Sequence, residues 1–120
     1  MLADPQSVTI NGVATSLPRT LNGATSNEYT ASDGNTKMIV KQNNTATRFR
    51  REIRLSQQKV AADPISALNA LSGCSVYLVI DEPRNGVFTD AELGYLVTAL
   101  VGWLSASSYA KTNAVLGGEY

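Results

Sequence analysis

The sequence predicts an α+β fold, in which an antiparallel β-sheet with an N-terminal hairpin is followed by two C-terminal helices packed on one face. Three observations support it: an Asn-Gly turn between two short strand-like segments, a stretch of alternating charged and apolar residues, and a helix-capping motif ahead of a wide apolar stripe. A chain of 120 residues suits a single domain, residues 1–120. We expect the β-sheet region over residues 1–88 and the helices over residues 89–116, with dimerisation completing the fold.

The first expected element is a hairpin. The dipeptide Asn11-Gly12 tolerates the positive φ angles of a two-residue turn, and it separates Val8–Ile10 from Val13–Thr15. A third strand is expected near Glu28–Thr30, and after a polar turn a fourth strand is expected from Thr36 to Lys41.

The segment from Thr47 to Gln57 alternates with a period of two, which assigns its side chains to the two faces of one strand. The apolar side chains point one way: Phe49, Ile53 and Leu55. The charged ones point the other way: Arg48, Arg50, Glu52 and Arg54. This predicts a sheet with one buried side and one basic side. Arg51 breaks the pattern on the apolar side, so we expect it to lie near a sheet edge or to pair with an acid.

Residues Ala61–Gly73 are predicted to form a long connection of small residues that serves as a contact loop, with a short helix at Ile65–Leu71 as an option. The chain is expected to return to a strand at Cys74–Ile80. Val76, Leu78 and Ile80 share one face of that strand. The opposite face carries Ser75, Tyr77, Val79 and Asp81.

The C-terminal region predicts helices. Thr89 and Glu92 have the spacing of a capping box, and a helix is expected from Asp90 to Leu104. A second, shorter helix is expected from Ser107 to Leu116. The first helix carries an apolar stripe too wide for one small sheet to cover, which predicts a dimer interface. The interface residues expected are Leu93, Leu96, Val97, Leu100 and Leu104.

The charge distribution is uneven although the chain is neutral overall. Between residues 37 and 59 there are seven Lys and Arg and a single acid, Glu52, so this stretch carries a net charge of +6. Each cation alone could be a solvated edge charge. Together on one face they are typical of a surface that neutralises phosphates.

The composition argues against catalysis. The chain has no His and one Cys, and it lacks a nucleophile–base pair, metal-ligand spacing and a Gly-rich phosphate loop, so we expect no enzyme activity, no cofactor, no metal and no small-molecule substrate. Cys74 is expected to be an inert free thiol. No signal peptide and no membrane span is expected, and so no membrane partner.

The order of hairpin, strands, connection, strand and helices resembles the coat proteins of single-stranded RNA bacteriophages, notably the Q-beta type. The local matches are Phe88–Glu92 running into the helix, Glu119-Tyr120 at the end, and Val40–Gln42 followed by a polar turn and the basic strand Arg48–Leu55. The resemblance implies that two subunits join their sheets edge to edge, interlock helices over the outer face and assemble into an icosahedral shell. It also implies that the inner face binds genomic RNA and a hairpin, which represses translation, and that the shell assembles in the bacterial cytoplasm and forms the virion.

Carried onto this sequence, the resemblance places Tyr77 where an aromatic ring stacks on a hairpin base, although a tyrosine can also simply shield a sheet surface. Val79 and Ile39 stand where polar residues are expected, which leaves the recognised hairpin open. Trp103 and Tyr95 are read as packing residues. The expected RNA-binding residues are Lys37, Lys41, Arg48, Arg50, Glu52, Arg54, Ser75, Tyr77 and Asp81.

Two other functions stay open. A cellular β-sheet RNA-binding module would carry clustered aromatic residues on its basic strands, and only Phe49 and Tyr77 are available, on opposite predicted faces. A shell protein without hairpin preference would share the dimer and the apolar helix but would not need Tyr77.

Overall fold

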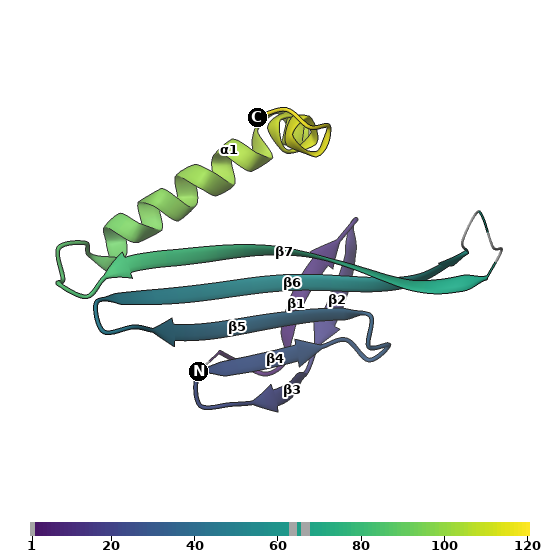
Figure 1. Cartoon of the computed structure of the whole chain (residues 1–120), viewed down its shortest axis with the longest axis horizontal. Coiled ribbons are helices and arrows are strands. Elements are labelled where there is room, and N and C mark those ends of the chain that lie inside the picture. The colour runs from purple at the N-terminus through teal and green to yellow at the C-terminus, as the bar shows by residue number, and fades with distance from the viewer. Residues whose placement is uncertain (1, 63–64, 66–67) are drawn as a thin grey trace. The chain divides into compact units, whose positions relative to one another are not determined.

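The computed structural model describes residues 2–62, 65 and 68–120. Within these residues the chain forms seven strands and one helix, in the order β1 to β7 and then α1 (Figure 1). The chain divides into two compact units, Met1–Glu82 and Pro83–Tyr120. The first unit holds a two-stranded sheet and a five-stranded sheet, and the second holds the helix.

The N-terminal hairpin is confirmed. Strands β1 (Gln6–Ile10) and β2 (Val13–Leu17) pair antiparallel, and Ile10 lies opposite Val13. The two residues between them have the positive φ angles that this turn requires, 50° at Asn11 and 77° at Gly12.

The larger sheet follows chain order, β3-β4-β5-β6-β7, and is antiparallel. Its strands are β3 (Arg19–Asn22), β4 (Ser26–Thr30), β5 (Thr36–Asn44), β6 (Arg48–Ala62) and β7 (Asn69–Pro83). The strands expected near residues 28–30 and 36–41 are confirmed as β4 and β5. Strand β3 was not predicted, because this short, mostly polar segment has no apolar alternation and becomes a strand only through its irregular pairing with β4.

The predicted connection Ala61–Gly73 is wrong in extent. Ala61 and Ala62 belong to β6, and Asn69–Gly73 belong to β7, which starts before the expected Cys74. The optional helix at Ile65–Leu71 is therefore excluded over residues 69–71, while residues 63, 64, 66 and 67 lie outside the described residues. Small residues have weak strand preferences, and here pairing between neighbouring strands overrides them.

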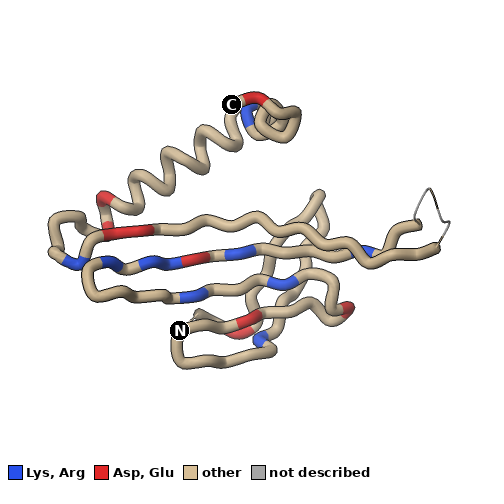
Figure 2. The backbone as a smooth tube through the Cα atoms, viewed as in Figure 1, with Lys and Arg blue, Asp and Glu red and all other residues tan. Residues whose placement is uncertain are grey.

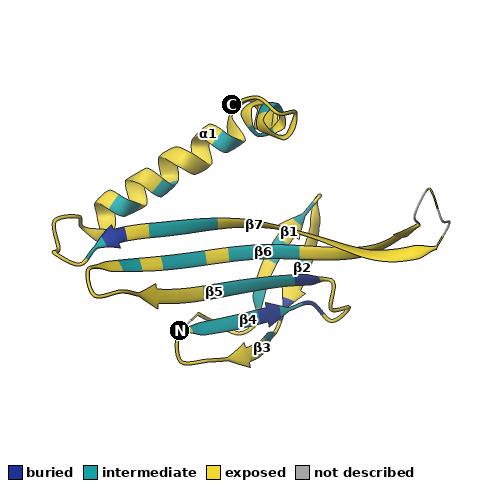
Figure 3. Cartoon of the chain, in the orientation of Figure 1, coloured by how far each residue is buried: buried dark blue, intermediate teal, exposed yellow. Residues whose placement is uncertain are grey.

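The core of the first unit lies between the hairpin and one face of the larger sheet. Its buried hydrophobic residues are Leu17, Tyr29 and Ala31, and Val8, Met38 and Val40 pack against them. We call this side of the sheet the hairpin face. It is only partly covered in the described residues, since Ile53 keeps 43% of its surface exposed and Val76 keeps 76%. In Figure 3, most of β7 has the colour of exposed residues.

The helix α1 (Asp90–Leu116) starts as predicted. Thr89 is the N-cap, and the backbone N–H of Glu92 donates to the Thr89 hydroxyl at 3.2 Å. The expected pair of separate helices is corrected to one helical element. The backbone leaves helical values inside it from Ala106 to Tyr109, so the interruption falls where the second helix was expected to begin.

By length and composition, α1 could cross a membrane, which contradicts the expectation that no segment of the chain could do so. The interruption after Ser105 divides it. The regular part from Asp90 has roughly 16 residues, about 24 Å at 1.5 Å per residue, whereas a membrane span needs about 20 residues and 30 Å. The helix is therefore weak evidence for a membrane segment.

Candidate nucleic-acid interface

The register of β5 and β6 collects charged side chains on one face. Directly opposite residues of paired strands point to the same side. Three pairings show which residues of β5 and β6 share a face: Lys37 with Ser56, Lys41 with Glu52, and Asn43 with Arg50. The face opposite the hairpin face therefore carries most of the cations of β5 and β6, and we call it the basic face. Figure 2 shows where the Lys and Arg residues lie along these two strands.

Strand β7 extends the basic face. The Arg48 Nε donates to the Asp81 carboxylate at 2.7 Å, and the Arg54 guanidinium lies 4.6 Å from the centroid of the Tyr77 ring. Ser75 lines an open hollow of about 410 Å³ together with Lys37 and Arg54. The alternation predicted for β7 is thus confirmed, and one face gathers all nine residues expected to bind RNA: Lys37, Lys41, Arg48, Arg50, Glu52, Arg54, Ser75, Tyr77 and Asp81.

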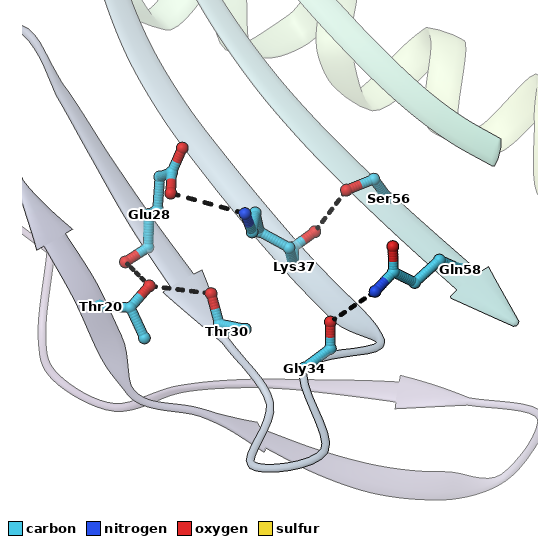
Figure 4. Close-up of polar contacts among 7 residues, drawn as sticks. All are labelled: Thr20, Glu28, Thr30, Gly34, Lys37, Ser56 and Gln58. Atoms are coloured by element: carbon cyan, nitrogen blue, oxygen red, sulfur yellow. Dashed lines mark hydrogen bonds and ion pairs between the residues drawn. The ribbon is translucent and has the colours of Figure 1, made fainter. Parts of the chain in front are cut away.

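Three of the five cations on this face have a carboxylate partner. Lys37 Nζ lies 3.7 Å from Glu28 (Figure 4), Arg54 Nη2 lies 2.8 Å from Glu52, and Arg48 pairs with Asp81 as described above. Among the described residues, Lys41 and Arg50 form no ion pair. No pattern in the sequence indicated Glu28 as a member of this face, because only the pairing of β4 with β5 brings it beside Lys37.

Arg54 is held more firmly than its neighbours. Its Nε and Nη2 both donate to one oxygen of Glu52, at 3.0 and 2.8 Å, while its guanidinium covers the Tyr77 ring. Tyr77 still exposes 57% of its surface. The ring is therefore oriented by a cation on one side and accessible to a stacking partner.

Neutral side chains of β3, β4 and β6 lie around Lys37 on the basic face (Figure 4). The hydroxyls of Thr20 and Thr30 share a 2.8 Å hydrogen bond, and Ser56 donates to the Lys37 carbonyl at 3.4 Å. Gln58 donates to the Gly34 carbonyl at 3.3 Å. These bonds join β3 to β4, and they join β6 to β5 and to the turn that precedes it.

Arg51 lies on the hairpin face, as the alternation predicts, and the expectation that it pairs with an acid is confirmed. It forms an ion pair with Glu82, whose side chain is only 8% exposed. Its guanidinium also lies 5.4 Å from the Phe49 ring centroid. Arg51 therefore supports the sheet from the side opposite the candidate interface.

The described residues contain no group of three or more His, Cys, Asp or Glu that could hold a metal ion. Cys74 is a free, exposed thiol.

In the second unit, no residue of α1 is buried. The residues expected at a dimer interface lie on its regular part, where Leu96 and Leu100 are exposed and the other three are half-buried: Leu93, Val97 and Leu104. An apolar helix of this kind needs cover from the sheet, from a second copy or from both.

Comparison with solved structures finds this fold in phage particles. The virus-like particle protein of bacteriophage AVE019 matches with a TM-score of 0.82 and 13% identity, over 99% of this chain and 98% of the other. The virus-like particle protein of Beihai levi-like virus 21 matches with a TM-score of 0.76 and 6% identity, over 100% and 98%. The capsid protein of bacteriophage GA matches with a TM-score of 0.66 and 10% identity, over 98% and 95%.

No protein-family model and no curated sequence matches the chain. The structural matches cover nearly the whole length of both proteins, so this chain has the fold of RNA phage coat proteins over nearly its whole given length.

Proposed function

We propose that this chain is the coat protein of a single-stranded RNA phage, a structural protein rather than an enzyme, which builds an icosahedral shell around its genome. The observation that carries the proposal is the coat-protein fold over nearly the whole chain. The matching structures are proteins of virus-like particles and a phage capsid protein. At 6–13% identity these matches support the fold alone. RNA binding must therefore be inferred from this chain's own residues.

The proposed assembly unit is a homodimer. Strand β7 is last in the sheet order and 15 residues long, and a long open edge strand is a site where another chain pairs. Pairing of β7 with β7 of a second copy would satisfy its outer backbone groups. The apolar stripe of α1, which includes Leu96 and Leu100, is a second surface that favours association.

The proposed RNA site is the basic face. Lys41 and Arg50 are available to phosphates without breaking an ion pair in the described residues, and Tyr77 offers an exposed ring to an unpaired base. A coat dimer that holds one RNA hairpin in this way would also repress translation of the message that contains it.

Two observations bear on the other candidates. Tyr77 is the one aromatic residue of β5, β6 and β7 on the basic face, because Phe49 lies beside Arg51 on the hairpin face. A cellular RNA-binding sheet would carry several aromatic residues on its basic face, so this placement disfavours that function. Ile39 and Val79 leave apolar surface on the basic face, which keeps a shell protein without hairpin preference as the second candidate.

Electron microscopy of the purified full-length protein tests the proposal. We expect uniform hollow particles that contain nuclease-protected RNA. A monodisperse small protein without particles, at high concentration and with RNA present, would contradict the capsid function. Particles whose protected RNA is not enriched in any hairpin over the RNA supplied would favour the second candidate.

A further inference from the structure

The ion pairs of the basic face raise a question about how it binds RNA. Lys37, Arg48 and Arg54 each face a carboxylate from Glu28, Asp81 and Glu52, respectively. A phosphate that approaches one of these cations meets an anion already in place. The local excess of positive charge is therefore much smaller than the run of cations in the sequence suggests.

These pairs are open to exchange. All three cation side chains are 40–47% exposed and their partners are 26–42% exposed. Exposed ion pairs are weak and are screened by salt. A phosphate held in place by the rest of an RNA can replace such a carboxylate, whereas a loosely bound phosphate competes with it poorly.

We propose that Glu28, Glu52 and Asp81 limit the affinity of the basic face for unstructured RNA by occupying three of its five cations. This inference rests on the proposed RNA-binding function and adds a regulation of that site. Lys41 and Arg50 contact phosphates of any strand. The three paired cations engage only an RNA whose fixed shape presents phosphates to them, so the carboxylates raise selectivity for a folded element.

Asp81 provides the sharpest test. Its pair with Arg48 joins β6 to β7 through one hydrogen bond at 2.7 Å, and both side chains are more than 40% exposed. The other pairs are less suitable, because Arg54 also holds Tyr77 and Lys37 lies at 3.7 Å from Glu28. Asp81→Asn keeps the shape of the side chain and removes its charge.

The experiment measures binding of a fluorescent uridine 20-mer to the full-length protein, over a range of salt and at concentrations where light scattering detects no particles. We expect Asp81→Asn to bind the 20-mer about fivefold more tightly at low salt, because Asp81 no longer competes with a phosphate for Arg48. A factor of this size is what the loss of one weak, exposed ion pair should produce. The salt slope should rise by about 0.7, one additional phosphate on a single strand.

Asp33→Asn is the matched control. It removes the same charge from the turn between β4 and β5, at the far end of β5 from Arg48, and an Asn can still accept the 2.9 Å bond from the Asn35 N–H. The double variant Arg48→Gln with Asp81→Asn separates an effect that acts through Arg48 from a general effect of removing one negative charge. We expect the gain to vanish in this double variant, since it acts through Arg48.

The outcomes separate the two proposals. If the wild-type protein binds the 20-mer with a clear salt dependence and Asp81→Asn gains no more than Asp33→Asn, the competition by carboxylates is refuted and the RNA-binding function stands. A gain that persists in the double variant also refutes it. If neither the wild-type protein nor Asp81→Asn binds the 20-mer, the RNA-binding function itself fails and the inference fails with it.

Discussion

Arg50 and Arg54 lie four residues apart on the same face of β6 but have different surroundings. Arg54 is bound to Glu52 and stacked on Tyr77, whereas Arg50 faces Asn43 across the strand pair and has no ion pair among the described residues. The two arginines should therefore act differently. Arg50 is free to neutralise a phosphate, while much of the effect of Arg54 is to position the aromatic ring.

Replacing Arg50 with Ala should weaken binding to all single-stranded RNAs and lower the salt slope by about 0.7, because one phosphate contact is lost. Fluorescence anisotropy at several salt concentrations measures both. Arg50→Lys keeps the charge and should keep the slope. Lys59→Ala, which by the alternation of β6 removes a cation from the opposite face, should change neither quantity. Unchanged salt dependence in Arg50→Ala would remove this residue from the interface.

Replacing Tyr77 with Ala should cost about 1–3 kcal/mol of binding free energy for a hairpin with an unpaired base, since base stacking on the ring is lost. Competition binding against a fully paired RNA duplex provides the comparison, and there the loss should be small. Tyr77→Phe keeps the ring and should behave like the wild-type protein. Equal losses for the hairpin and the duplex would show that the ring supports the sheet and does not stack on a base.

The break in α1 is the most unusual backbone feature of the described chain. Ser107, Ser108 and Tyr109 have φ angles of 53°, 57° and 63°, a left-handed conformation that costs a non-glycine residue about 1–2 kcal/mol. Two contacts join the helical residues before this turn to those after it. The Thr112 hydroxyl donates to the Leu104 carbonyl at 2.9 Å, and Lys111 Nζ lies 5.1 Å from the Trp103 ring centroid.

Replacing Ser108 with Gly should raise the free energy of unfolding by up to about 1 kcal/mol, because glycine adopts positive φ without steric cost. The control is Ser105→Gly, three residues earlier at a position with helical backbone angles, where glycine should instead destabilise by about 0.5–1 kcal/mol. Thermal or urea unfolding measures both. Destabilisation of the same size at both positions would argue that residue 108 is helical in solution.

At the scale of the whole molecule, the small core has consequences for assembly. The first unit buries only three hydrophobic side chains among the described residues, and α1 buries none. Much apolar surface is therefore left to be covered, and association with a second copy is an efficient way to cover it.

Replacing Leu100 with Asp should abolish dimers and particles. Burial of a leucine stabilises by about 1.5–3 kcal/mol, and the loss occurs twice in a symmetric dimer, so the dissociation constant should rise at least about 100-fold. Size-exclusion chromatography with light scattering measures the mass. Leu116→Asp makes the same change at the last residue of α1, outside the predicted stripe, and should leave assembly intact. Dimers of normal stability in Leu100→Asp would exclude the stripe as an interface.

The sequence by itself determined the features that depend on neighbouring residues. Asn11-Gly12 predicted the hairpin turn, the alternation in β6 and β7 predicted which side chains share a face, and Thr89 predicted the helix start. Each of these is set by local geometry: a turn angle, a period of two or a hydrogen bond within one turn. The sequence therefore indicated which side chains share the basic face, and their binding to RNA stays a prediction.

Only the tertiary structure decided which charges neutralise each other and how far the strands run. Arg48 meets Asp81, 33 residues away, and Lys37 meets Glu28, because the register of neighbouring strands brings them together. Pairing between strands also extends β6 and β7 through small residues that by themselves favour a loop. These features depend on contacts between segments distant in sequence, and no local pattern encodes the partner.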